Sequence, residues 1–538
     1  MNLQSGWLFL KKHSLSVLAL LIIAVLLTPI LFSGLYSDDL MNFQYLRSIP
    51  DFTFQKMLDY ANTEIDNTLQ TGRYTPVSFY LLSFMHWLPE TVFQYKLLVY
   101  IGNLIAVASF VFFLHKAQMT NYIGIALLFY AAIIQFQVGY HDCFTSLNAM
   151  YPVATSCSLL AVAFYMDVMQ KSSPLKWFGA IVFACLTLLI TEVGTVTFLI
   201  IIALTVLNYK TLQKRVTLAL PFILLPIFYF GYLKSIRDHI TINYSGVKTS
   251  FNAYGMFKVF ACQVFSTLPL SNFYKLYAIP QLFVEQLKDP LVILGCIILL
   301  VLIIFFFLRF EHTTYGLQKL RLDHLPTGVL YWFIPAMILM FSAKYQDELR
   351  LGFAYLPLYF QNFGLVIIVT TVYAFFAERW KGITAPIKWM VAPLFVLIII
   401  SSYLLNCCMV NARNQDQSVP AGYFYQSIKT GILNPATDNS VLVLGSDFFY
   451  QQANKYRMIF YNVSGKHFEV IEQNDFDWTK VSPDKAVYRL YYDTEKGLSQ
   501  LFKMDKTTGA FTKINEMPYP PAKAVTYAEM RTIRKMFF

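Results

Sequence analysis

Two adjacent carboxylates, Asp38 and Asp39, directly follow the first long apolar run of the chain, from Leu15 to Leu35. They stand where a membrane-spanning helix would reach the membrane surface. Carboxylates so close to lipid are costly to keep ionised unless they are solvated, paired or used in chemistry. In this position they suit a general base, or ligands of a divalent cation such as Mg²⁺ or Mn²⁺. Ser37 before them is a good helix N-cap, so a solvated helix start explains the same residues equally well.

Cationic side chains recur near the predicted membrane boundaries. In the segment Gly72-Arg73-Tyr74-Thr75-Pro76, Arg73 stands at the entry of a short apolar stretch, where a guanidinium suits a lipid phosphate. Arg237 follows a later apolar run, and a charged turn carries Lys344 and Arg350. We interpret these four residues as candidate phosphate ligands. The alternatives are that Arg73 extends its side chain to lipid headgroups, and that Lys344 and Arg350 belong to an ordinary solvated turn.

Three further residues are candidates for orienting a substrate. Glu192 lies at the tip of a tight hairpin between two apolar runs, a position that packing does not explain. Tyr74 adjoins Arg73, and His141 lies in a polar turn, for which an ordinary loop is the simpler explanation. No G-x-S-x-G, P-loop, H-E-x-x-H or dinucleotide fingerprint occurs, so the sequence gives no sign of ATP or a nucleotide cofactor.

The composition predicts an integral membrane protein. The 538 residues are 57% hydrophobic and only 14% charged, whereas soluble proteins carry about 25% charged residues. The formal net charge of +11 is spread through short loops, where orientation in the membrane and anionic lipid explain it better than nucleic acid. The seven cysteines show no C-x-x-C spacing, so neither a zinc site nor a disulfide framework is indicated.

Apolar runs of about 17–25 residues predict eleven spans. They cover roughly 14–35, 91–114, 121–140, 152–170, 175–191, 194–209, 216–233, 290–308, 326–343, 353–377 and 384–406. Lys and Arg in alternate loops place the N-terminus in the cytoplasm and the C-terminus outside. The loops 36–75 and 234–289 and the tail then lie on the outer face. The segment 77–88 is too short to span and reads as an interfacial helix, and 234–289 predicts one or two such helices or a lid.

A second domain is predicted after the last span, where polar residues, Gly and Pro become common. The segment 439–445 reads as a buried strand, and 487–492, 501–504 and 510–514 read as a meander. We therefore predict a transmembrane module over 1–410 and a small α/β domain outside the membrane over 411–538.

This layout resembles the GT-C superfamily of membrane glycosyltransferases. The resemblance lies in the cytoplasmic start, the single span before Asp38 and Asp39 in the first outer loop, and Arg73 with Pro76 opening a juxtamembrane helix. Within that superfamily the chain most resembles bacterial polytopic glucosyltransferases that modify surface polysaccharide, such as the O-antigen of lipopolysaccharide. It lacks the W-W-D-type motif of oligosaccharyltransferases. Where the mannosyl and aminoarabinose branches have His-Pro-Pro or Lys-Pro-Pro, Tyr74-Thr75-Pro76 stands instead.

The resemblance implies a polyprenyl-phosphate sugar donor, a cell-envelope glycan or lipid acceptor, and inversion at the transferred sugar. The enzyme would be a hexosyltransferase of the bacterial inner membrane, with its C-terminal domain in the periplasm or outside the cell. Asp38 or Asp39 would be the base. The donor phosphate would be bound by Arg73, Lys344, Arg350 and Arg237, and Glu192, His141 and Tyr74 would orient the substrates. A divalent cation held by Asp38 and Asp39 stays open.

Three other functions compete with this interpretation. A transporter or flippase would need polar residues along the middle of several spans, whereas the charges here gather at one rim. A polysaccharide polymerase or ligase would be expected to show more Arg and His in a late outer loop than Arg237 and His239. An assembly protein whose outer domain binds a partner would tolerate replacement of Asp38 and Asp39.

Overall fold

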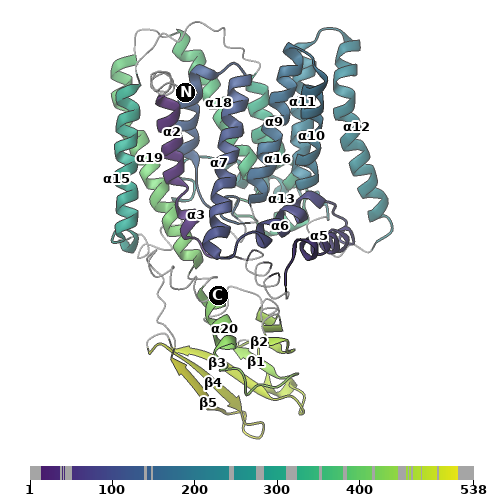
Figure 1. Ribbon diagram of the computed structural model, residues 1–538, viewed down its shortest axis with the longest axis vertical. Coiled ribbons are helices and arrows are strands. Elements are labelled where there is room, and N and C mark those ends of the chain that lie inside the picture. Colours follow the sequence, from purple (N-terminus) through teal and green to yellow (C-terminus); the bar gives the residue numbers. More distant parts are fainter. Residues whose placement is uncertain are drawn as a thin grey trace.

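The computed structural model describes most of the chain as a helical bundle with a small sheet domain at one end (Figure 1). The residues that it describes are 14–36, 39, 42, 46, 51–137, 142–146, 149–240, 248–273, 284–310, 324–350, 354–379, 384–414, 419–445, 456–457, 460–461, 464–473, 475–493 and 496–518. The helices are α2 (Ser14–Leu26), α3 (Pro29–Phe32), α5 (Phe54–Leu69), α6 (Pro76–Trp87), α7 (Val92–Lys116), α8 (Ile123–Ile133), α9 (Met150–Gln170), α10 (Pro174–Ile190), α11 (Thr195–Asn208), α12 (Leu212–Arg237), α13 (Ala253–Phe265), α15 (Pro290–Arg309), α16 (His324–Met340), α17 (Ala343–Glu348), α18 (Leu358–Arg379), α19 (Thr384–Arg413) and α20 (Val419–Lys429).

Each of the eleven predicted spans contains a helix, although α8 ends at Ile133, before the end of the predicted span 121–140. By length and composition, seven helical segments of the described chain can cross a membrane: α2 with α3, α7, α9, α12, α15, α18 and α19. The other four predicted spans are the shorter apolar helices α8 with its preceding turn, α10, α11 and α16. The 17 residues of α10 extend for about 25 Å, slightly less than the hydrocarbon core of a bilayer. The predicted polytopic helical membrane protein with a small C-terminal domain is confirmed.

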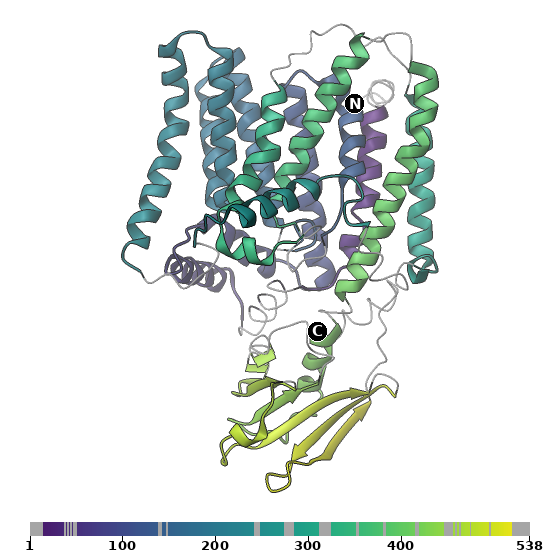
Figure 2. The ribbon, with the colours of Figure 1, turned by 180° about the vertical axis from the view of Figure 1, so that it is seen from behind.

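We call the end of the bundle that is nearest the C-terminal sheet the domain end. α5, α6 and α13 lie across this end, and the sheet domain extends beyond it, whereas α2 begins at the opposite end (Figure 2). The helix predicted at 77–88 is present as α6, which begins with a proline in its first turn. α13 lies within the predicted segment 234–289. The helix α5 was not predicted, and its N-cap Thr53 accepts a hydrogen bond from the Lys56 amide.

Two helices of the bundle, α16 and α18, approach each other through glycines. A Cβ atom on Gly364 would lie 2.5 Å from the Trp332 amide nitrogen and 2.7 Å from the Gly328 carbonyl oxygen. Small residues let helix backbones come this close in a membrane, where dispersion contacts and not hydrophobicity hold helices together. The contact also orients Trp332, whose carbonyl accepts a 2.7 Å hydrogen bond from Gln361.

Gly364→Val should therefore destabilise the protein by about 1–3 kcal/mol, as over-packing does in other cores. Thermal unfolding of the purified protein in detergent measures the loss. Gly231→Val is the matched control, because a Cβ atom on Gly231 meets nothing within 4 Å. Equal unfolding temperatures for the two variants would contradict the close contact between α16 and α18.

The C-terminal domain is a five-stranded sheet with the helix α20 packed against it. Its strands are β1 (Val441–Leu444), β2 (Glu469–Glu472), β3 (Val487–Asp493), β4 (Leu498–Met504) and β5 (Phe511–Pro518), in the order β2-β1-β3-β4-β5. β1 pairs in parallel with β2 and β3, and β3, β4 and β5 form the predicted antiparallel meander. α20 covers one face, where Ser427 and Tyr492 share a 2.7 Å hydrogen bond. The strand β2 was not predicted.

The helix α19 links the bundle to this domain. It continues as far as Arg413, so the predicted domain boundary between 410 and 411 lies inside the helix. Its last turn therefore belongs to the bundle, and it carries residues of the site described next.

Candidate functional site

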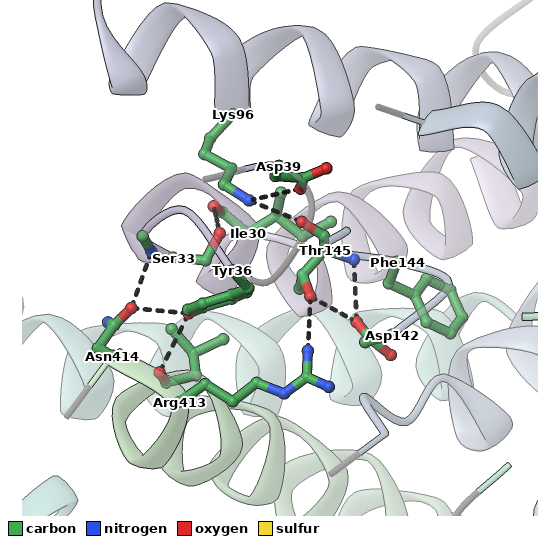
Figure 3. Close-up of polar contacts among 12 residues, drawn as sticks. Ile30, Ser33, Tyr36, Asp39, Lys96, Asp142, Phe144, Thr145, Arg413 and Asn414 are labelled. Atoms are coloured by element: carbon green, nitrogen blue, oxygen red, sulfur yellow. Dashed lines mark hydrogen bonds and ion pairs between the residues drawn. The ribbon is translucent and has the colours of Figure 1, made fainter. Parts of the chain in front are cut away.

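Asp39 is buried at the domain end and faces a buried lysine. Its side chain is 1% exposed, and its Oδ2 lies 3.8 Å from Nζ of Lys96, which is fully buried. Lys96 stands in the second turn of α7 and donates a 2.7 Å hydrogen bond to the Thr145 carbonyl oxygen (Figure 3). A buried charge requires a partner of opposite sign, and Asp39 and Lys96 lie within ion-pair distance of each other. Asp38, the other predicted carboxylate, lies outside the described residues.

Arg413 lies beside the same residues, although it is 268 positions from Thr145 in the sequence. Its side chain comes from the last turn of α19, and Nη1 donates a 3.3 Å hydrogen bond to Thr145 Oγ1. Figure 3 shows Thr145 between Lys96 on one side and Arg413 on the other. The side chain is 5% exposed, yet Nε and Nη2 of Arg413 find no hydrogen-bond partner in the described part of the chain. A buried guanidinium whose Nε and Nη2 have no partner among the described residues is suited to bind an anion.

Asp142 completes this group and fixes its geometry. Oδ1 accepts a 2.8 Å hydrogen bond from the Gln137 amide, and Oδ2 accepts from both the amide and the hydroxyl of Thr145 at 2.9 and 2.7 Å. Burial raises the pKa of Asp142, while the charge of Arg413 and the three hydrogen bonds lower it in part. Asp142 thereby holds Thr145 in the one place from which it contacts both cations. We call Asp39, Lys96, Asp142, Thr145 and Arg413 the central group.

Tyr36 contacts both cations of the central group and Asn414, the residue that follows Arg413 at the end of α19. Its ring centroid lies 5.1 Å from Lys96 Nζ and 5.4 Å from Arg413 Cζ, so one aromatic ring adjoins both cations. Its hydroxyl donates a 2.7 Å hydrogen bond to Asn414 Oδ1, which also accepts from the Gly34 amide at 2.8 Å. The path of the chain from α3 to Asp39 is thus fixed against the last turn of α19.

Glu192, Arg73 and Arg237 form a second group at the same end of the bundle. Glu192 Oε1 lies 4.0 Å from Arg73 Nε and 3.8 Å from Arg237 Nη2, and each of the three side chains is roughly one-third exposed. Arg237 also donates a 2.8 Å hydrogen bond to the Gly72 carbonyl. Three predicted residues from distant segments therefore come together. One carboxylate faces two guanidinium groups, which leaves a net positive charge that water only partly screens.

Tyr151 interacts with the second group. It stands in the first turn of α9, shortly after the loop that carries Asp142 and Thr145. Its side chain hydrogen-bonds Thr191 and interacts with the charges of Arg73 and Glu192. The start of α9 therefore connects the central group with the second group.

The other predicted residues have different positions. Tyr74 contributes its carbonyl oxygen, which accepts a 2.6 Å hydrogen bond from Tyr229, and its ring packs edge-on against Tyr232. Lys344 lies on α17, which packs against α13 and α16, and its ammonium is 5.9 Å from the Tyr345 ring. Arg350 follows that helix and is exposed. His141 lies outside the described residues.

Lys96, Asp142, Thr145 and Arg413 were not predicted as site residues. For the two cations a signal was present in the sequence. Lys96 stands at the start of a span and Arg413 after the end of another, both at the end of the bundle predicted to lie outside, where the positive-inside rule disfavours such residues. A basic residue in that place indicates a buried partner or a ligand.

A metal site does not emerge from the part of the chain that is described. No group of three or more His, Cys, Asp or Glu side chains there could hold an ion. Asp39 already has the Lys96 ammonium beside it, and a lysine cation in that place disfavours a second positive charge. Asp38, the other carboxylate predicted to hold a cation, lies outside the described residues, so a divalent cation held by this pair stays a prediction.

Comparisons with known proteins find similarity among solved structures. No protein-family model and no curated protein matches the chain. Among solved structures, the chain is similar to the crystal structure of ArnT from Cupriavidus metallidurans bound to undecaprenyl phosphate. The TM-score is 0.41 and the sequence identity 10%, over 91% of this chain and 94% of that chain. A likeness at this score leaves the chemistry of the site to be argued from the contacts of this chain's own residues.

Proposed function

We propose that the protein is a GT-C-type membrane glycosyltransferase that moves a hexose from a polyprenyl-phosphate donor to a glycan or lipid acceptor of the cell envelope. The observation that carries the proposal is the central group: a carboxylate and two cations, all buried, where the predicted outer loops meet the bundle. Buried charges at a membrane boundary are costly, and such residues usually serve a function. The pairing of a base with an anion site is what transfer from a lipid phosphate requires.

Arg413 is the residue we assign to the donor phosphate. Its Nε and Nη2 form one edge of the guanidinium, and neither is used by the described residues. This edge matches two oxygens of a phosphate. Arg73 and Arg237 of the second group add positive charge at the same end of the bundle and suit the approach of an anionic lipid headgroup.

Asp39 is the residue we assign as the general base. The acceptor hydroxyl attacks the anomeric carbon from the face opposite the phosphate, and the new C–O bond forms with inversion. The electron pair of the broken bond stays on the phosphate oxygen, where Arg413 stabilises the charge that develops. The hydroxyl proton passes to Asp39.

The remaining residues support these two roles. Lys96 positions Asp39 and, with Asp142, holds Thr145 against Arg413. Glu192 lies between two arginines and suits the hydroxyl groups of a sugar or acceptor. We place the protein in the bacterial inner membrane with the domain end facing outward. A sugar flipped to the outer leaflet on its lipid carrier would then reach the central group.

Sugar transfer in a reconstituted system tests the proposal. The full-length protein, in vesicles of bacterial phospholipid, receives a panel of polyprenyl-phosphate hexoses together with lipopolysaccharide as acceptor. We expect transfer from one donor, with an inverted anomeric configuration in the product by NMR. A folded protein that transfers sugar from none of the donors would overturn the assignment and favour a transporter or an assembly protein.

A further inference from the structure

Three buried polar groups beside the central group lack partners among the described residues. They are Nε2 of Gln137, Oγ of Ser146 and Oδ1 of Asn272, in side chains that are at most 3% exposed. A buried polar group without a hydrogen bond costs free energy, and native proteins contain few of them. All three are neutral. Together they offer a donor, a hydroxyl and an acceptor.

The segments that carry these groups are tied to one another and to the central group. The Gln137 amide donates to Asp142 Oδ1 at 2.8 Å, and the Ser146 amide donates to the Asp142 carbonyl at 3.0 Å. Asn272 Nδ2 donates a 2.7 Å hydrogen bond to the carbonyl of Phe136. Gln137 and Ser146 are therefore bonded to Asp142 directly, and Asn272 is bonded to Phe136, the residue before Gln137.

Further hydrogen bonds hold these segments rigid. Gln135 donates to the Leu268 carbonyl at 2.7 Å, and its Oε1 accepts from the Asn272 amide at 3.2 Å. The Phe136 amide donates to Asn406 Oδ1 at 2.8 Å. Short segments from three parts of the chain are thus fixed in place before any ligand binds, which is how a protein lowers the entropic cost of binding.

From these observations we infer that Gln137, Ser146 and Asn272 bind the hydroxyl groups of the transferred sugar, and that this sugar is uncharged. The inference rests on the proposed function and names its substrate class. Amide and hydroxyl groups satisfy sugar hydroxyls, which both donate and accept. A cationic amino sugar would need a carboxylate, but among the described residues of the central group Asp142 already accepts three hydrogen bonds and Asp39 already faces Lys96. A neutral hexose fits this set without leaving a charge unpaired.

The test compares the affinity for polyprenyl phosphate with the affinity for the same lipid bearing a hexose. Gln137→Glu keeps an oxygen to accept the 3.3 Å hydrogen bond from the Ala354 amide and replaces only the unpartnered N–H₂. Ser146→Ala removes one hydroxyl and leaves the backbone hydrogen bond to Asp142 in place. With the full-length protein in lipid nanodiscs, we expect each variant to bind polyprenyl phosphate as the wild type does. Each should lose about tenfold of the extra affinity that the hexose provides.

Gln263→Glu is the control for the effect of a buried charge alone. Gln263 is fully buried on α13 and, like Gln137, has an unpartnered amide within the described residues, but no recorded hydrogen bond links it to the central group. The Gln263→Glu variant should leave unchanged the extra affinity that the hexose provides. An equal loss in Gln263→Glu would overturn the inference, and so would unchanged affinity in Ser146→Ala, which is expected if buried water satisfies these groups.

The donor panel separates this inference from the proposed function. A protein that binds no polyprenyl phosphate and transfers no sugar would overturn the proposed function. A protein that transfers sugar but binds a cationic amino-sugar donor more tightly than a neutral hexose donor would overturn the inference alone. We expect the amino-sugar donor to bind no more tightly than polyprenyl phosphate without a sugar.

Discussion

Asp39→Asn is expected to lower kcat for sugar transfer by about 10²–10⁴-fold, the usual contribution of a general base. The amide has the size of the carboxylate but cannot take the proton of the acceptor hydroxyl. KM for the donor should change little, because the lipid phosphate is bound by Arg413 and not by Asp39. Initial rates in lipid vesicles, measured over a range of donor concentrations, separate the two parameters.

The control for the Asp39→Asn variant is a double variant that also replaces Lys96, the buried partner of Asp39. Without the Asp39 charge, the fully buried ammonium loses its carboxylate partner, and the breaking of a buried pair costs about 3–5 kcal/mol. The double variant Asp39→Asn, Lys96→Met should recover much of that stability in thermal unfolding while transfer stays lost. Activity that survives in a folded Asp39→Asn variant would move the base elsewhere, with Glu192 as the next candidate.

Arg413→Lys is expected to weaken the binding of polyprenyl phosphate by about 10–100-fold. The lysine keeps the charge but loses the flat edge formed by Nε and Nη2, and an Arg that binds two oxygens at once is not replaced by a point charge. Binding of the lipid without a sugar, measured in nanodiscs by displacement of a fluorescent analogue, gives the dissociation constants. The kcat should also fall, because the leaving phosphate is less stabilised.

Arg215→Lys serves as the matched variant. Arg215 lies in the first turn of α12, at the end of that helix opposite Arg237, and donates to the Tyr209 carbonyl. The same change of side chain there should leave lipid binding as it was. If the two variants weaken binding equally, Arg413 does not contact the phosphate, and Arg73 with Arg237 becomes the more probable phosphate site.

The fold was predictable because membrane spans obey a simple rule. Long apolar runs must form helices in lipid, where every backbone group needs an internal partner, and each of the eleven predicted runs contains a helix. The C-terminal meander was predictable from its turns and from the alternation of buried residues. The strand β2 was missed because Glu469–Glu472 has four residues, begins and ends with glutamate, and pairs with β1 through contacts distant in sequence.

The site was predictable only in part. Asp39, Arg73, Arg237 and Glu192 stood out because charges next to apolar runs need an explanation, and the structure gathers the last three into one group. Lys96 and Arg413 stand out only once the orientation of the spans is considered, because both are basic residues at the end of the bundle predicted to lie outside. Their partners lie 49 and 268 residues away, and no local pattern in a single sequence records such distances.

The contact between Tyr36 and Asn414 has a consequence for biosynthesis. The two residues are 378 positions apart, so the ribosome must complete almost the whole membrane module before they can meet. Until α19 has been inserted, Thr145 lacks the guanidinium that fixes its hydroxyl, and the path from α3 to Asp39 lacks its anchor. Nascent chains that end before residue 413 therefore contain the buried Lys96 but lack the Arg413 side chain that completes the central group. The last span completes the site, so a quality-control protease that senses unpaired polar groups in lipid would distinguish truncated chains from complete ones.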